Sequence, residues 1–142
     1  MKSTQKIYGL QELNFLNNGK VKVGVLGGTF DPAHTGHLMI SKRALDFYNF
    51  DYVIWLVANQ NPLKKKNERN IFKRAEQSLS IVDDDRILVS IVEHDFDTQY
   101  MYDSMSCLIE HFPNVEFTWM MGIDNIVDFP KWHRSREIPK LC

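Results

Sequence analysis

The sequence predicts an α/β fold in which a parallel sheet carries helices on both faces. Runs of β-branched and apolar residues alternate with stretches in which apolar side chains recur every three or four residues. Glycines, prolines and polar turns bound the apolar runs, as is typical of buried parallel strands joined by helical crossovers. We therefore expect βαβ units with right-handed crossovers.

Each element follows from its own stretch of sequence. Strands are expected at residues 21–26, 52–57, 87–92 and 115–121. Helices are expected at residues 35–48, 68–81 and 100–111, each with an apolar face. Residues 1–20 have no clear period and are interpreted as a leader outside the core, so that residues 21–142 form a single domain.

Composition excludes several classes of protein. The 142 residues carry a formal net charge of −1, which argues against a strongly basic nucleic-acid binder. No apolar run approaches the roughly 20 residues that a membrane-spanning helix needs, so no membrane partner is expected. Cys107 and Cys142 make neither a disulfide framework nor a zinc site. We expect a cytoplasmic protein with free thiols.

The residues that stand out all follow a predicted strand. Glycines, histidines and polar side chains cluster in four loops, at residues 27–37, 59–66, 95–100 and 122–132. Ligands of parallel α/β sheets bind beyond the carboxyl ends of the strands, near the point where the strand order reverses. The sequence therefore predicts one site built from these four loops.

Residues 27–37, which read GGTFDPAHTGH, are the strongest signal. Gly27 and Gly28 allow a tight turn and the close approach of backbone to a ligand. We expect Thr35 to cap the following helix, whose N-terminus presents unpaired N–H groups that suit an anion.

Two histidines flank this helix start. His34 and His37 are three residues apart, so in a first helical turn they lie on one side. Two imidazoles and a helix end that face the same space form a phosphate site. The alternative is a plain glycine turn with two surface histidines.

This string resembles the signature of the nucleotidyltransferase superfamily, and in detail that of the nicotinate-nucleotide adenylyltransferases. The related pantetheine-phosphate adenylyltransferases usually carry threonine where His34 stands. The resemblance spans residues 21–138 and implies a Rossmann-like sheet of which about four strands are present. The family's last strand and C-terminal helix, with an Ile-Ser-Ser/Thr-x-Ile-Arg motif, have no counterpart, so the fourth strand should lie at or near a sheet edge.

The resemblance implies an activity. The family transfers an adenylyl group from ATP to nicotinate mononucleotide in NAD biosynthesis, and releases deamido-NAD and pyrophosphate. ATP and nicotinate mononucleotide would be the partners, and Mg²⁺ would be carried with ATP without dedicated protein ligands. Whether the chain forms a homo-oligomer stays open.

The resemblance also implies the roles of individual residues. Catalytic contacts fall to His34, His37 and Lys64. ATP contacts fall to Gly27, Gly28, Thr29, Phe30, His34, His37, Gly122 and Asp124. Nicotinate mononucleotide contacts fall to Thr29, Lys64, Tyr100 and Trp132. For Lys64 a solvated loop is the alternative, because Asn61 and Leu63 depart from the family's Pro-Pro-His-Lys stretch.

Two alternative functions stand beside this interpretation. The chain could be a truncated, catalytically impaired nucleotide-binding remnant of such an enzyme. It could also be a related adenylyltransferase that uses pantetheine phosphate as the acceptor. Met101, which replaces a threonine of the family pattern, leaves the acceptor open.

Overall fold

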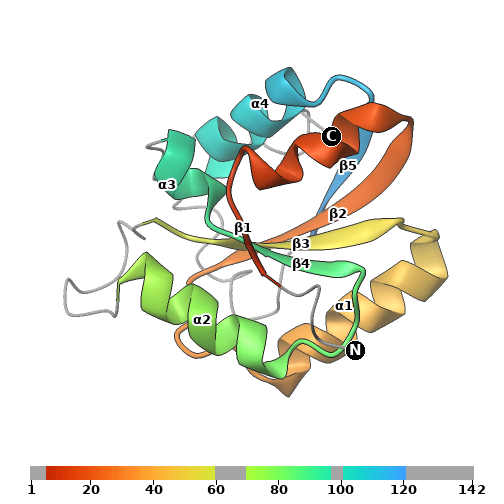
Figure 1. The fold of residues 1–142 in the computed structure, drawn as a ribbon. Coiled ribbons are helices and arrows are strands. Elements are labelled where there is room, and N and C mark those ends of the chain that lie inside the picture. The colour runs from red at the N-terminus through yellow and green to blue at the C-terminus, as the bar shows by residue number, and fades with distance from the viewer. Residues whose placement is uncertain (1–5, 60–69, 97–100, 121–142) are drawn as a thin grey trace.

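The computed structural model describes residues 6–59, 70–96 and 101–120 (Figure 1). These residues form a five-stranded sheet in the order β1-β4-β3-β2-β5, and every neighbouring pair is parallel. The strands are β1 (Ile7–Tyr8), β2 (Val21–Gly28), β3 (Tyr52–Val57), β4 (Ile87–Ser90) and β5 (Val115–Met120). The helices are the 3-10 helix η2 (Glu12–Asn18), α1 (Thr35–Tyr48), α2 (Ile71–Ile81), α3 (Val92–Phe96) and α4 (Met101–His111). The expected α/β class is confirmed.

Two apolar cores lie on the two faces of the sheet (Figure 1). Along β3, Val53, Trp55 and Val57 join the core that α1 and α2 cover. Ile54 and Leu56, which point to the opposite face, join the core that η2 and α4 cover. Because both faces are covered, β3 is apolar throughout instead of alternating. None of the helices in the described ranges is long and apolar enough to cross a bilayer.

Most element boundaries match the sequence predictions. The helix at 35–48 and the strand at 52–57 are confirmed at both ends, and the strand predicted at 21–26 extends to Gly28. The helix predicted from residue 68 begins at Ile71, where the Asn70 side chain accepts a hydrogen bond from the backbone N–H of Lys73 at 2.9 Å. The strand predicted at 87–92 ends at Ser90, and α3 begins at Val92.

The interpretation of residues 1–20 as a leader outside the core is wrong for the described residues 6–20. β1 pairs in parallel with β4, which adds a fifth strand to the four expected. In η2, Leu13 and Leu16 are fully buried in the core beside α4. A two-residue strand and a short helix are too brief to show a period, so the sequence pattern missed both.

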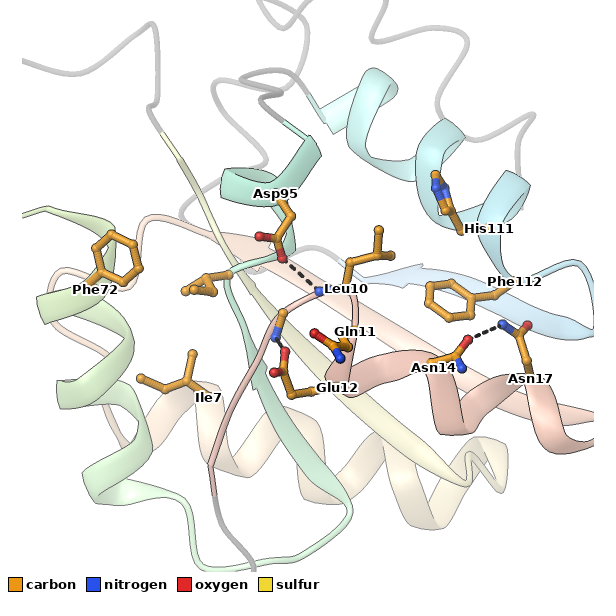
Figure 2. A pocket seen from close by; sticks show the side chains of 12 residues that line it. Ile7, Leu10, Gln11, Glu12, Asn14, Asn17, Phe72, Asp95, His111 and Phe112 are labelled. Carbon is orange, nitrogen blue, oxygen red and sulfur yellow. Dashed lines mark hydrogen bonds between the residues drawn. The ribbon is translucent and has the colours of Figure 1, made fainter.

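Polar contacts hold this N-terminal segment onto the sheet edge (Figure 2). The backbone N–H of Leu10 donates to the Asp95 carboxylate of α3 at 2.8 Å, and that of Gly9 donates to Glu12 at 2.8 Å. A Cβ atom on Gly9 would lie 2.7 Å from the Asp95 carboxylate, so glycine lets the chain pass closely here. The segment is therefore an integral part of the domain.

The strand order places a reversal at β2. From β2 the chain moves through β3 to β4 in one direction, then returns to add β5 on the other side of β2. In the described residues β5 has β2 as its single neighbour, as expected for a strand at the sheet edge. The loop that follows β2 therefore lies where ligands of such sheets bind.

A core substitution tests whether the N-terminal segment is integral. Leu13→Ala should lower the free energy of unfolding by roughly 2–5 kcal/mol, because it removes a fully buried side chain from a packed core. Chemical denaturation measures this loss. Gln11→Ala, at an exposed position beside the same helix, should change stability by less than about 0.5 kcal/mol. Equal effects of the two substitutions would contradict the assignment.

Candidate functional site

The loop between β2 and α1 is held by one buried aromatic side chain. Phe30 adopts a left-handed backbone conformation with φ of 52°, which costs an L-residue roughly 1–2 kcal/mol. Its ring is buried and stacks on Trp55, with centroids 5.3 Å apart and planes 17° apart. Burial of the ring offsets the backbone cost and fixes the path of the loop.

The helix cap is made by histidines. Thr35 was expected to cap α1, but Thr35 is the first helical residue and His34 is the N-cap. The backbone N–H of Gly36 donates to His34 Nδ1 at 3.1 Å, and the backbone N–H of His34 donates to His37 Nδ1 at 3.1 Å. This reciprocal pair is a capping box in which imidazole nitrogens replace the usual side-chain oxygens.

The cap assigns the protons of both imidazoles. A ring nitrogen that accepts a hydrogen bond carries no proton, so in the neutral rings the proton of His34 and that of His37 sit on Nε2. Nε2 is the ring nitrogen that takes no part in the cap. The centroids of the two rings are 4.0 Å apart. Both rings therefore stand at the helix start, where the backbone N–H groups of the first turn also suit an anion.

The His37 ring packs against two aromatic rings. Its ring lies 4.7 Å from that of Phe30 and 5.9 Å from that of Trp55, centroid to centroid. Trp55 Nε1 donates to Ser41 Oγ at 2.7 Å, and Ser41 Oγ donates to the backbone oxygen of His37 at 2.8 Å. Trp55, which is fully buried in the core, thus anchors the first turn of α1.

Gly36 makes room for the cap. A Cβ atom at this position would lie 2.8 Å from Cε1 and 2.9 Å from Nδ1 of His34. Any larger residue would push the imidazole away from the amide that it caps. Glycine between the two histidines is therefore required by the geometry of the cap.

A buried arginine, which the sequence analysis missed, joins the ends of two strands. Arg74 of α2 is only 3% exposed, and its Nη1 donates to the backbone oxygens of Thr29 at 2.9 Å and Ala58 at 2.7 Å. These residues directly follow β2 and β3. Arg74 lies with Ile71, Ala75 and Ser78 on the buried face of α2, and a charge on that face was the available signal.

A buried glutamate completes this network. Glu93 accepts a hydrogen bond from the backbone N–H of Asn59 at 2.8 Å and another from Ser104 Oγ at 2.7 Å. Burial raises the pKa of Glu93 to about 7, against the hydrogen bonds from Ser104 and Asn59 and the positive charge of Arg74. The carboxyl ends of β2, β3 and β4 are thus linked through side chains.

The structure brings together six of the predicted site residues. They surround the end of β2 and the start of α1: Gly27, Gly28, Thr29, Phe30, His34 and His37. The others lie outside the described residues, and their roles stay predictions: Lys64, Tyr100, Gly122, Asp124 and Trp132. In the described ranges no group of three His, Cys, Asp or Glu side chains could hold a metal ion.

A separate cavity has a volume of about 830 Å³ (Figure 2). It is lined by the N-terminal segment, Phe72 of α2, Asp95 of α3, and His111 and Phe112 at the end of α4. None of its lining residues belongs to the predicted site.

Sequence comparison identifies a family and several relatives. Residues 25–142 match the protein family described as cytidylyltransferase-like. The chain is 41% identical over 119 residues to a protein of Parvibaculum lavamentivorans and 38% identical over 116 residues to one of a Ruegeria species. Both carry the name probable nicotinate-nucleotide adenylyltransferase. The matches cover 83% and 82% of this chain but 59% and 61% of the relatives, so the chain spans about three-fifths of their length.

Structural comparison supports the fold. A Plasmodium falciparum nicotinic acid mononucleotide adenylyltransferase complexed with NaAD superposes with a TM-score of 0.68 at 17% identity. The superposition covers 83% of this chain and 60% of that protein. The Rossmann-like arrangement of parallel strands and helices is therefore confirmed.

A substitution at Gly36 tests the histidine cap. Gly36→Ala should displace the His34 ring and speed exchange of the residue-36 amide about tenfold, because that amide loses its acceptor. The free energy of unfolding should change by less than about 1 kcal/mol, since better helix propensity offsets the lost cap. Hydrogen exchange and denaturation measure the two effects. Thr35→Ala is the control, and equal exchange in both variants would contradict the cap.

The titration of Glu93 predicts a pH dependence of stability. Between about pH 4.5 and pH 7 the unfolded chain loses the Glu93 proton while the folded chain keeps it. The unfolded state then binds fewer protons, so stability falls as pH rises, by roughly 3 kcal/mol in all.

Glu93→Gln removes this effect, because the amide can accept from Asn59 and donate to Ser104 without titrating. Relative to wild type, the variant should gain roughly 3 kcal/mol between about pH 4 and pH 8. Denaturation across this range measures the gain. Glu76→Gln, an exposed position on α2, is the control, and parallel curves for wild type and Glu93→Gln would refute the prediction.

Proposed function

Because the chain belongs to the cytidylyltransferase-like family, we propose that the loop from Gly27 to His37 binds the phosphates of ATP in an adenylyl transfer to nicotinate mononucleotide. The histidine cap is the observation that supports this proposal best. It holds Nδ1 of both rings in hydrogen bonds at the start of α1, just after the end of β2, so that Nε2 carries the proton of each neutral ring. The names of the curated relatives support the choice of acceptor.

The proposed reaction is a direct displacement at phosphorus. A phosphate oxygen of nicotinate mononucleotide bonds to the α-phosphorus of ATP, and the bond from that phosphorus to the bridging oxygen of pyrophosphate breaks. Deamido-NAD and pyrophosphate leave, and the protein forms no covalent intermediate. Catalysis then rests on holding both substrates in line and on stabilising negative charge at the transferring group.

The described residues supply the charge stabilisation. His34 and His37 donate from Nε2 to the ATP phosphates, and their fixed tautomers mean that little reorganisation is needed as charge develops. The backbone of Thr29 and Phe30, which Arg74 and the stacked Phe30 ring hold in place, would line the substrate site. These donors are preorganised before any ligand arrives.

Other roles in this proposal fall on residues outside the described ranges. Lys64 would contact a substrate phosphate, and Tyr100 and Trp132 would contact nicotinate mononucleotide. Gly122 and Asp124 would contact ATP. A cytoplasmic location and assembly into a homo-oligomer also stay predictions.

Mg²⁺ is proposed as a companion of ATP. The described residues offer no cluster of three metal-binding side chains, so they do not form a metal centre of their own. When bound to the phosphates, Mg²⁺ neutralises charge on ATP and pyrophosphate.

An adenylyl transfer assay tests the proposal. The 142-residue chain is mixed with ATP, Mg²⁺ and either nicotinate mononucleotide or pantetheine phosphate, and products are separated by chromatography. We expect deamido-NAD with the first acceptor, and a loss of about 10²–10³-fold in His37→Ala, because a preorganised donor is removed. His111→Ala replaces an exposed histidine on α4 and should keep full activity.

Each contrary result points to a different alternative. Product with pantetheine phosphate alone would reassign the acceptor. ATP binding that depends on His37 without turnover, in a folded chain, would identify a nucleotide-binding remnant. A folded chain that does not bind ATP would overturn the proposal.

A further inference from the structure

A glutamine of α2 holds the backbone directly before the histidine pair. Gln77 Oε1 accepts from the backbone N–H of Ala33 at 2.7 Å, and Gln77 Nε2 donates to the backbone oxygen of Ala33 at 3.1 Å. Ala33 is buried and immediately precedes His34, the N-cap of α1. The side-chain amide thus satisfies both polar groups of one buried residue.

The other end of the same loop is held by the same helix. Arg74 donates to the backbone oxygen of Thr29, four residues before Ala33. Arg74 and Gln77 are three residues apart on α2 and therefore project from the same side of the helix. Between them they bond both ends of the loop that carries Phe30.

The contacts of Arg74 extend to the next strand end. Its guanidinium also donates to the backbone oxygen of Ala58, and Glu93 accepts from the neighbouring backbone N–H of Asn59. Ser78 Oγ donates to the backbone oxygen of Arg74 at 2.8 Å, within the same buried face. The loop after β2 and the loop after β3 are therefore both hydrogen-bonded to α2.

We propose that Gln77 and Arg74 are positioning residues for the His34–His37 pair, and that α2 sets where the two imidazoles stand relative to the sheet. The contacts stand independently of ligand, whereas their consequence for ATP rests on the proposed function. Neither side chain needs to touch the nucleotide.

The chemistry of Gln77 makes the inference specific. An amide supplies one donor and one acceptor, which match the oxygen and the N–H of Ala33. A glutamate at this position keeps the size but presents two acceptors, so the backbone oxygen of Ala33 would face a carboxylate. A displacement of about 1 Å in a catalytic group can cost about 10²-fold in rate.

Hydrogen exchange of the free protein tests the positioning without any ligand. The amides of His34 and Gly36 bond to the imidazoles, so their protection reports the geometry of the pair. In Gln77→Glu and Gln77→Ala both amides should exchange about tenfold faster, which corresponds to loss of about one net hydrogen bond. Arg74→Lys should act in the same direction, because one ammonium cannot reproduce the guanidinium fork.

Two variants on the same helix serve as matched controls. Leu79→Ala removes a partly buried side chain of the core, so it lowers stability without touching the loop. Glu76→Gln changes an exposed position. Neither should speed exchange at residues 34 and 36 beyond its effect on the rest of α1. If Leu79→Ala and the Gln77 variants have the same exchange profile, the inference is overturned.

Kinetics and binding then connect the positioning to ATP. Gln77→Glu should weaken ATP binding about tenfold, or lower kcat/KM for ATP by as much, with little change in KM for nicotinate mononucleotide. A merely destabilising variant such as Leu79→Ala should leave these constants unchanged in the folded fraction. If ATP does not bind to the wild type, the proposed function fails, while the exchange measurement still decides whether α2 positions the histidines.

Discussion

The hydrogen bonds of the buried Arg74 guanidinium are the interaction on which the loops at the carboxyl ends of the strands depend. Parallel strands end together, and the backbone oxygens of the loops that leave them need hydrogen-bond donors. Arg74 bonds such oxygens after β2 and after β3. Burying a charge is costly unless hydrogen bonds compensate, and the backbone oxygens of Thr29 and Ala58 provide them for Arg74.

Glu93 is the buried acidic group at the same strand ends. Its carboxyl group accepts from Asn59 and Ser104, so its oxygens are satisfied although the side chain is buried. Burial still dominates and raises its pKa to about 7. The strand ends are therefore joined by groups whose charge is held at an energetic cost, which is typical of sites where geometry matters more than stability.

The histidine pair combines a structural role with a chemical one. The hydrogen bonds that cap α1 are the same ones that place the ring protons on Nε2. Phe30 packs against the His37 ring, and Trp55 and Ser41 form a hydrogen-bond chain to the His37 backbone oxygen. These contacts hold the first turn of α1 in place. The cap and this support together fix how the two rings stand at the helix start.

Local sequence pattern was enough to predict most of the strands and helices. Continuous apolar runs predicted β2, β3 and β5, and three-to-four spacing predicted α1 and α4, because burial on one or two faces leaves a periodic record. The histidine string likewise predicted where the six described site residues gather, at the end of β2 and the start of α1, and its role in phosphate binding stays a prediction. Tertiary structure alone decided that residues 7–18 join the sheet and core, since a two-residue strand and a single short helix carry no readable period. It also decided that His34 rather than Thr35 is the cap, because histidine is not among the usual capping residues. It decided that Arg74, Gln77 and Glu93 hold the loops, because these contacts join residues up to 45 positions apart and no local pattern records them.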